Sequence, residues 1–217
     1  MLPVALGAGA NQALRILCLG AHSDDIEIGC GGTLLRLLGE RAGSSVHWVV
    51  LSATPERERE ANASAAEFLA EAQSSTVVVK TFPESFFPSA WADIKKAFEE
   101  IKRAATPDVV LCHHRKDFHQ DHRVVAELAW NTFRDHVILE YEIPKYEGDL
   151  ATPNFYVPIS RLVADRKVDL LLRHFASQAV RPWFRPDTFH GLMAVRGVEC
   201  NAPQGRAEAF HARKLSL

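Results

Sequence analysis

Ala13-Leu14-Arg15-Ile16-Leu17-Cys18-Leu19-Gly20 runs directly into Ala21-His22-Ser23-Asp24-Asp25. This stretch decides the fold, because an apolar run of this length indicates a buried strand of a parallel sheet. A second run, Pro107-Asp108-Val109-Val110-Leu111-Cys112, leads in the same way to His119-Gln120-Asp121-His122. The carboxyl ends of parallel strands share one edge of the sheet, so we expect the two polar clusters to meet in one crevice.

Strands and helices are expected to alternate after the first strand. This alternation predicts an α/β fold, a single Rossmann-like domain over residues 13–217 with a mostly parallel sheet flanked by helices, after a loose lead-in at 1–12. The stretch after Arg181 is rich in loop signals. The further expected strands are 46–51, 76–80, 137–141 and 155–159, and the expected helices begin at Gly29-Cys30-Gly31-Gly32-Thr33 and Asp121 or span 55–70, 90–105 and 162–177.

The composition is ordinary for a soluble globular protein, with 217 residues of which 47% are hydrophobic and 24% charged. A formal net charge of −2 gives no basic surface for nucleic acid or an anionic membrane. No run approaches the roughly 18–20 apolar residues that span a bilayer. The first residues, Met1–Gly7, lack the basic region of a signal peptide. We therefore expect a cytoplasmic protein with no nucleic-acid partner and no membrane span.

The four cysteines form no C-x-x-C pair, and the sequence does not indicate a disulfide framework. Cys18 and Cys112 lie inside expected strands and are predicted to be small core residues.

The two polar clusters together predict a catalytic metal site. Such zinc sites combine imidazole and carboxylate ligands, three from the protein, with an open fourth position. His22, Asp25 and His122 are the predicted ligands. His122 falls in the first turn of a helix, which disfavours a charged imidazole, and the neutral ring is the form that binds metal. Zn²⁺ is the predicted ion, with Fe²⁺ as an alternative that these ligands leave open.

The remaining polar residues of the clusters suit the chemistry of amide hydrolysis. Asp24 would be free to take a proton from the attacking water and to return it to the leaving amine. His119 is predicted to donate to the oxyanion, and Asp121 to orient an imidazole. The structural alternative is that Ser23 and Asp24 cap a helix and that residues 117–122 form a polar loop.

The sequence resembles the PIG-L/LmbE-like family of zinc-dependent N-acetylglucosaminyl deacetylases. Ala21-His22-Ser23-Asp24-Asp25 is similar to the A-H-P-D-D signature of the family, and Asp117-Phe118-His119-Gln120-Asp121-His122-Arg123 is similar to its H-x-D-H element. Three weaker likenesses follow the same order along the chain. They are Arg57–Ala61 with an R-x-x-E-A helix, His174–Gln178 with an H-x-S-Q element, and Ala207–Phe210 with an A-E-x-F element.

Carried over position by position, the resemblance implies the same roles that the chemistry indicates: metal ligation by His22, Asp25 and His122, acid–base catalysis by Asp24, and oxyanion stabilisation by His119 with support from Asp121. The chain departs from the family at Ser23, where proline is usual, and at Ile26, where an acidic residue is frequent and Glu27 follows one place later. Neither departure removes a ligand.

The resemblance implies hydrolysis of the N-acetyl group of an N-acetylglucosamine-type or related amino-sugar small molecule or glycoconjugate, giving acetate and a free amine. Arg57, Glu84 and His174 are the candidate substrate-binding residues. Arg57 and Glu84, which follow expected strand ends, would bind sugar hydroxyls or a phosphate, with a solvated or helix-capping charge as the alternative, and His174 would reach the rim of the site. The aromatic and basic segment Arg181–Arg185 is predicted to form a substrate wall, a packed C-terminal segment or a contact between copies of the chain.

Two other functions stay open at the level of sequence. One is a zinc hydrolase of another amide or ester, such as a thiol-conjugate amidase or an O-deacetylase. The other is a non-catalytic module that binds a sugar or a nucleotide. The spare Asp24 and the open fourth ligand position argue against the module, because structural zinc sites are closed by four protein ligands.

Overall fold

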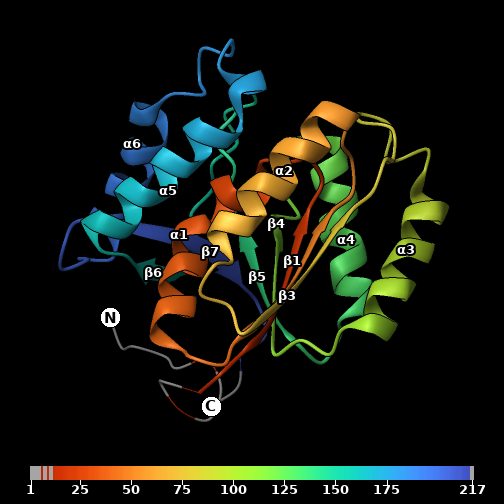
Figure 1. Ribbon diagram of the computed structural model, residues 1–217, viewed down its shortest axis with the longest axis horizontal. Coiled ribbons are helices and arrows are strands. Elements are labelled where there is room, and N and C mark those ends of the chain that lie inside the picture. The colour runs from red at the N-terminus through yellow and green to blue at the C-terminus, as the bar shows by residue number, and fades with distance from the viewer. Residues whose placement is uncertain (1–5, 7–8, 10–11, 216–217) are drawn as a thin grey trace.

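Five parallel strands form most of the sheet in the computed structural model, which describes residues 6, 9 and 12–215 (Figure 1). Their order is β3-β2-β1-β4-β5. β1 pairs with β2 on one side and with β4 on the other, so the direction in which the sheet grows reverses between β1 and β4. Ligands of open α/β sheets bind at this reversal. The bounds are β1 Arg15–Gly20, β2 Ser45–Val50, β3 Ser74–Val79, β4 Val109–His113 and β5 Val137–Tyr141.

Two antiparallel pairings complete the sheet beyond β5. β7 (Ala207–Ala212) lies between β5 and β6 (Phe155–Pro158) and runs antiparallel to both. The prediction of a mostly parallel sheet is therefore confirmed. β7 itself was not predicted, because the buried Glu208 interrupts the apolar pattern by which a core strand is recognised.

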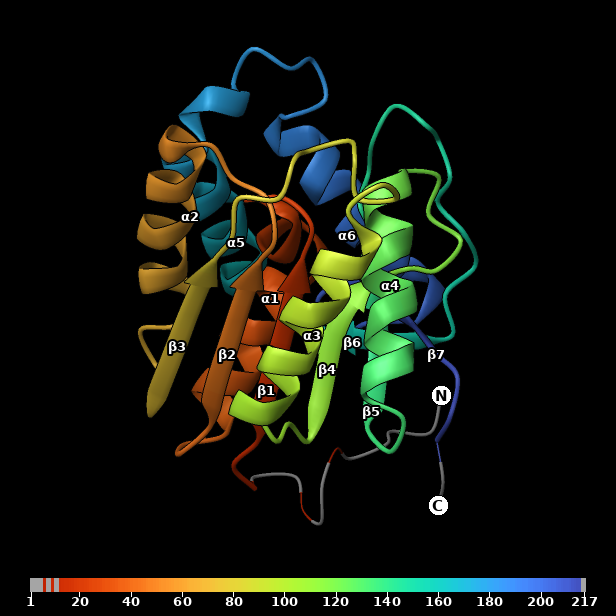
Figure 2. The ribbon, with the colours of Figure 1, turned by 90° about the vertical axis from the view of Figure 1, so that its right-hand side faces the viewer.

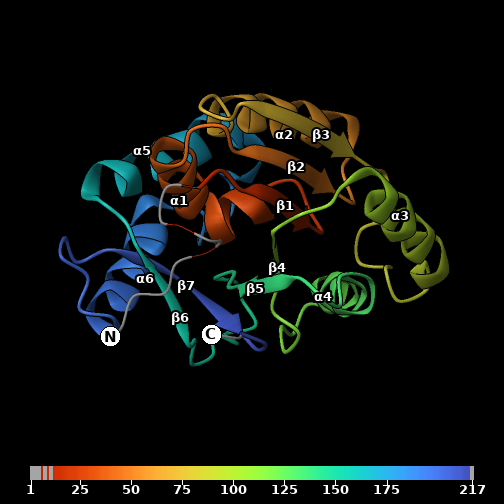
Figure 3. The ribbon, with the colours of Figure 1, turned by 90° about the horizontal axis from the view of Figure 1, so that it is seen from below.

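Helices cover both faces of the sheet, as Figures 1 and 3 show. Ile16 and Cys18 of β1 point to one face and pack with four helices, whereas Leu17 and Leu19 point to the other and pack with two. This alternation gives two apolar cores, one on each side of the sheet. The first face carries α1 (Asp25–Glu40), α2 (Pro55–Phe68), α5 (Arg161–His174) and α6 (Pro186–Glu199), and the second carries α3 (Trp91–Ala104) and α4 (Gln120–Thr132).

Two sequence predictions need correction. α1 begins at Asp25 and not at Gly29, so the glycine-rich run lies inside the helix and not at its start. The stretch after Arg181 contains α6, where we expected loop. Pro186 stands at the first helical position, which suits its fixed φ, and Phe189 is buried in the core. The apolar face of this helix is short and is flanked by turn-forming residues, so the sequence pattern did not predict a helix here.

The other elements agree with the expected ones to within a few residues at each end, and the expected helix 162–177 ends as α5 followed by a short 3-10 helix at Ala176–Gln178. All four cysteines are buried and free. Most of the predicted lead-in 1–12 lies outside the described residues. None of the helices in the described part of the chain is both long and apolar enough to cross a membrane.

Candidate metal centre and active site

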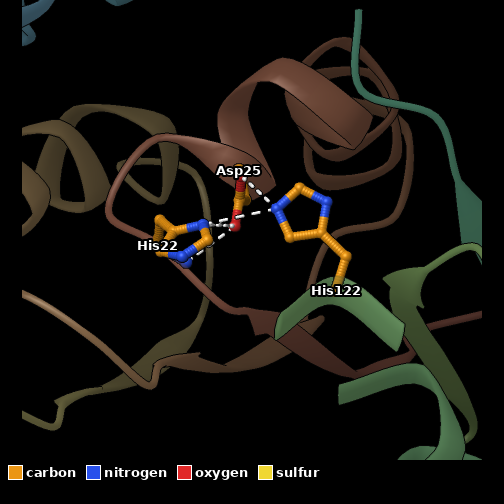
Figure 4. A group of neighbouring side chains, drawn as sticks. All are labelled: His22, Asp25 and His122. Carbon is orange, nitrogen blue, oxygen red and sulfur yellow. Dashed lines mark hydrogen bonds and ion pairs between the residues drawn. The ribbon is translucent and has the colours of Figure 1, made fainter. Parts of the chain in front are cut away.

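The polar clusters that follow β1 and β4 meet at the carboxyl edge of the sheet, which lies uppermost in Figure 2. His22 Nδ1 lies 3.3 Å from Asp25 Oδ2 and 3.3 Å from His122 Nε2. His122 Nε2 lies 3.5 Å from Asp25 Oδ1. The three side chains converge on one another from separate loops and helix starts (Figure 4). The expected meeting of the two clusters is therefore what the structure shows.

These separations fit a metal ion. Ligand atoms at about 2.0–2.2 Å from a tetrahedral zinc ion stand roughly 3.3–3.6 Å apart. The distance between the two imidazole nitrogens and the distance from each of them to one of the two Asp25 oxygens fall in this range, and the three residues form one of the groups able to hold an ion. The residues present fit a divalent cation with two nitrogen ligands and one carboxylate.

His22, Asp25 and His122 are called the trio below. Each of its two imidazoles contacts a further carboxylate through the ring nitrogen that faces away from the other members. Asp121 Oδ2 lies 3.2 Å from His22 Nε2, and Asp117 Oδ2 lies 2.9 Å from His122 Nδ1. Contacts of this kind fix the ring orientation and the tautomer of a metal-binding histidine. Lys145 Nζ in turn lies 3.0 Å from Asp117 Oδ2, which extends the chain of contacts to the loop after β5.

Asp121 also holds the loop that follows β3. Its two oxygens accept hydrogen bonds from the backbone amides of Ser85, at 2.6 Å, and Phe87, at 3.1 Å. Ser85 has a φ of 68°, a left-handed conformation that non-glycine residues adopt uncommonly. The carboxylate that orients His22 therefore also fixes the backbone of the neighbouring loop.

Burial and neighbouring charges shift the pKa values of His22 and His122 in opposite directions. Burial lowers the pKa of His122 to about 3, with the charge of His113 acting in the same direction, so His122 is neutral and ready to bind metal. Burial also opposes a charge on His22, but Asp25 and Asp121 outweigh it and raise its pKa to about 10. Burial likewise opposes ionisation of Asp25, yet the surrounding imidazoles hold its pKa well below the usual range.

Asp24 stands beside the trio with a different partner. It is the N-cap residue of α1, is 6% exposed, and makes an ion pair of 2.9 Å with Arg57 on α2. Burial raises the pKa of Asp24, and Arg57 acts against that rise. A buried carboxyl group with a raised pKa next to a metal site is well suited to accept and return a proton.

Arg57 is itself held in place by residues of two weak sequence motifs. Arg57 Nη1 lies 3.3 Å from Glu60 and donates to Ser177 Oγ at 2.9 Å. The amide and hydroxyl of Ser177 both donate to Glu60, at 2.9 and 2.7 Å. The guanidinium also lies 5.5 Å from the ring centroid of Phe175. The R-x-x-E and H-x-S-Q elements thus meet to orient one arginine toward Asp24.

His119 is the N-cap residue of α4. Its Nδ1 accepts a hydrogen bond from the Asp121 amide at 3.2 Å. An imidazole that accepts at Nδ1 carries its proton at Nε2 when neutral, and burial lowers the pKa of His119 toward that neutral form. The cap thereby leaves an N–H donor at Nε2, within the same group of side chains as His22 and Asp121.

The other two candidate substrate-binding residues lie at different distances from the trio. Glu84 is exposed in the loop after β3, where its charge acts on His22. His174 is the last residue of α5, and its Nε2 lies 2.9 Å from Glu67 on α2. The structure therefore brings Glu84 near the centre and pairs His174 with a helix on the flank.

Sequence reasoning missed three residues of this centre. His113 ends β4, and its Nε2 lies 3.1 Å from Asp25 Oδ2 while its ring stacks on His122 at 3.8 Å. Asp117 and Lys145 form the contacts behind His122 described above. His113 follows the buried run that ends at Cys112, so the rule that polar residues at strand ends form sites would have found it. No sequence pattern around Lys145 indicates a role in the site.

Ser23 and Ile26, at the positions where the chain departs from the family pattern, are both buried, and so is Glu27, which follows Ile26. Glu27 accepts a 2.6 Å hydrogen bond from Ser64 on α2, and burial raises its pKa well above the usual range. Ile26 is fully buried in the core. One departure is therefore in the buried loop before α1 and the other is on the packed side of α1, and both leave the ligand set intact.

The fold and the centre define an α/β protein with a two-histidine, one-carboxylate site at the reversal point of a parallel sheet. The model of the PIG-L family, described as GlcNAc-PI de-N-acetylase, matches residues 17–133, which include both polar clusters. The chain belongs to this family of deacetylases.

A curated relative is similar to this chain in sequence, and two solved structures are similar to it in fold. The uncharacterized deacetylase YaiS of Escherichia coli K12 is 31% identical over 156 residues, which cover 66% of this chain and 82% of YaiS. The N,N'-diacetylchitobiose deacetylase of Pyrococcus horikoshii has a TM-score of 0.68 at 18% identity, with 92% and 83% of the two chains covered. GalB, the 4-carboxy-2-hydroxymuconate hydratase of Pseudomonas putida KT2440, has a TM-score of 0.74 at 19% identity over 94% and 97%.

Proposed function

We propose that the protein is a metal-dependent N-deacetylase that hydrolyses the N-acetyl group of an amino-sugar small molecule or glycoconjugate to acetate and a free amine. One observation carries the proposal: Asp24 lies next to the trio His22, Asp25 and His122 but is directed to Arg57 instead. Asp24 is the N-cap residue of α1 but makes no capping hydrogen bond with its side chain, so its carboxyl group can serve as the acid–base group that hydrolysis of an amide uses.

His22, Asp25 and His122 would hold the ion, with Zn²⁺ the proposed metal and Fe²⁺ the alternative. A divalent ion at this position supplies a Lewis acid for the acetyl carbonyl and lowers the pKa of the attacking water. Asp24 accepts the proton that the water loses as its oxygen bonds to the carbonyl carbon. When the carbon–nitrogen bond breaks, Asp24 returns that proton to the nitrogen, so one water and one amide become acetate and an amine.

His119 and Arg57 complete the proposed site. The Nε2 proton of His119 donates to the carbonyl oxygen as negative charge develops there. Arg57 and the exposed Glu84 lie beside Asp24 and His22, respectively, where they would bind hydroxyl groups of the sugar. His174 pairs with Glu67 on the flank, and its link to this proposed site is through the neighbouring Phe175 and Ser177, which contact Arg57.

The relatives support the amino-sugar substrate without settling it. The family description names a GlcNAc-containing lipid and the Pyrococcus enzyme acts on diacetylchitobiose, both with an N-acetyl amino sugar. GalB shares the fold and is named as a hydratase, so the fold alone does not fix the reaction. The proposal therefore depends on the side chains of the centre.

The test is acetate release from N-acetylglucosamine, N,N'-diacetylchitobiose, a GlcNAc-inositol and a UDP-linked sugar, with and without a chelator. Asp24→Ala is expected to retain one metal per chain and to lose at least about 10²-fold in kcat. His122→Ala is expected to lose both metal and activity. Near-normal turnover by Asp24→Ala would refute the proposed mechanism. Release from O-acetyl but not N-acetyl sugars would assign the centre to an esterase.

A further inference from the structure

A buried ion pair from the C-terminal third of the chain reaches into the interior of α1. Lys167 of α5 and Glu208 of β7 are 3% and 4% exposed, and their Nζ and Oε1 atoms lie 2.5 Å apart. Lys167 Nζ also donates to the backbone carbonyl of Ile28 at 2.7 Å. The Glu208 carboxylate accepts from the backbone amides of Gly32, at 2.9 Å, and Thr33, at 2.6 Å.

These contacts resemble those at the two ends of a helix, although they occur inside one. A carboxylate that accepts from two successive backbone amides is the pattern of a helix N-terminus, and an ammonium group at a backbone carbonyl is that of a C-terminus. In a regular helix the amide of Gly32 donates to the carbonyl of Ile28. Here each of those two groups has a charged side chain as a partner. Lys167 and Glu208 thus contact the backbone of the continuous helix α1 at the junction between its first turn, Asp25–Ile28, and the turns that follow.

The glycines of α1 make room for this arrangement. A Cβ on Gly32 would lie 3.0 Å from Glu208 Oε1 and 2.9 Å from Ile159 Cδ1. A Cβ on Gly29 would lie 2.2 Å from the ring of Tyr141. Gly32 therefore allows the Glu208 carboxylate to approach the helix backbone, and Gly29 allows the first turn to lie against the sheet.

The first turn is the part of α1 that carries the chemistry. Asp25 is a proposed metal ligand, and Asp24 caps the same turn. Tyr141, which packs on Gly29, also contacts the ring of His113 at 4.8 Å, and His113 contacts Asp25. The position of both acidic groups depends on how this turn is anchored at Ile28.

We infer that Lys167 and Glu208 are positioning residues for the metal centre: they anchor the first turn of α1 so that Asp25 meets His22 and His122, and Asp24 meets the substrate. This inference rests on the proposed metal-dependent function. It assigns a role to the A-E-x-F element, to the glycine run of α1 and to a part of the chain outside residues 17–133, which the family model matches.

The test measures the dissociation constant of Zn²⁺ by competition with a chromophoric chelator, together with Tm. Glu208→Gln keeps the size of the side chain but removes its charge. Gly32→Ala keeps the ion pair but displaces the carboxylate by one methyl group. Both variants are expected to weaken Zn²⁺ binding by about tenfold. Once saturated with metal, they are expected to show a lower kcat at unchanged KM, because Asp24 has moved.

Matched controls separate positioning from general loss of stability. Glu142→Gln removes the charge from another buried pair, Glu142 with Arg196, which joins the loop after β5 to α6. Gly191→Ala adds a methyl group to α6 where a Cβ meets nothing within 4 Å. Both controls are expected to bind Zn²⁺ within about twofold of the unchanged protein, even where Glu142→Gln lowers Tm as much as Glu208→Gln does.

Two results would overturn the inference. One is Zn²⁺ binding by Gly32→Ala and Glu208→Gln equal to that of the unchanged protein. The other is a loss of binding that follows Tm equally in the test and control variants. Failure of the unchanged protein to bind any divalent metal would instead overturn the proposed centre, so the two failures are distinguishable.

Discussion

The Arg57 guanidinium lies 2.9 Å from the Asp24 carboxylate, and this contact joins the residue proposed to bind substrate to the residue proposed to move the proton. Burial raises the pKa of Asp24, and Arg57 is the largest influence that lowers it. Burial and the charge of Asp25 thus oppose the ionisation of the proposed base, while Arg57 and, to a smaller extent, His22 favour it.

Replacing Arg57 is expected to shift the pH dependence of the reaction. In Arg57→Met the pKa of Asp24 rises further, so Asp24 stays protonated to a higher pH. The acid limb of the kcat/KM profile should move up by about one pH unit. Arg59→Met, an exposed position on the same helix, is the control and should leave the limb in place. An unshifted limb in Arg57→Met would show that Asp24 is not the titrating base.

The two roles of His119 can be separated by substitution. Asparagine is a favourable N-cap residue, so His119→Asn should keep the start of α4 while removing the Nε2 donor. We expect kcat to fall by about 10²–10³-fold with little change in KM or Tm. His119→Ala should lose the same activity and about 1 kcal/mol of stability as well. Full activity in His119→Asn would exclude oxyanion stabilisation by this residue.

Metal binding is expected to release a proton from His22. Its pKa of about 10 in the metal-free protein means that the ring is charged at neutral pH, and a metal ligand must be neutral. Metal affinity should therefore fall about tenfold for each pH unit below 10. Calorimetry in buffers of different ionisation enthalpy should give one proton released per Zn²⁺ at pH 7. No release would mean that His22 is already neutral.

The same shift affects the stability of the metal-free protein. A histidine whose pKa is raised on folding contributes stability that is fully present below its unfolded pKa of about 6.5 and is lost as pH rises toward 10. The contribution of His22 should therefore decline with rising pH in that window. Comparing Tm of the metal-free protein with that of metal-free His22→Asn across pH 6–10 isolates it.

The contacts behind His122 are expected to tune metal affinity. Asp117→Asn leaves an acceptor for His122 Nδ1 but removes the charge, and it should weaken Zn²⁺ binding by about 10–100-fold. Lys145→Met acts one step further away, through Asp117, and should have a smaller effect in the same assay. Lys95→Met, at a partly buried lysine on α3, serves as the control. An equal loss in Lys145→Met and Lys95→Met would show that the contact with Asp117 has no influence.

The sequence was sufficient for those parts of the molecule that have a local signal. Apolar runs that end in polar clusters predicted β1 and β4, and the parallel arrangement then predicted that His22 and His122 would meet. α6 and β7 were not predicted, because their apolar faces are short and pack on residues that are distant along the chain. Pro186 and Gly191 resemble loop residues, and Glu208 resembles a surface residue, until their packing is known.

The same reason explains which site residues were missed. Asp117, Lys145 and Lys167 act through partners between 5 and 139 positions away, and charged residues in loops and helices are ordinarily solvated. Arg57 was among the candidate residues, with sugar hydroxyls or a phosphate as its expected contact, and the structure adds a partner that was not expected, the Asp24 carboxylate. The identity of a side chain is visible in sequence, whereas its partner is a property of the fold.

Asp121 holds the ring of His22 on one side and the backbone of Ser85 and Phe87 on the other. A ligand that displaces this loop on binding must also displace the support of an imidazole that is proposed to bind metal. Thermodynamic linkage then requires that the ion and such a ligand change each other's affinity by the same factor. The occupancy of the proposed metal site would in that case change with the concentration of substrate, and metal binding would in turn change the affinity of the loop for its ligand.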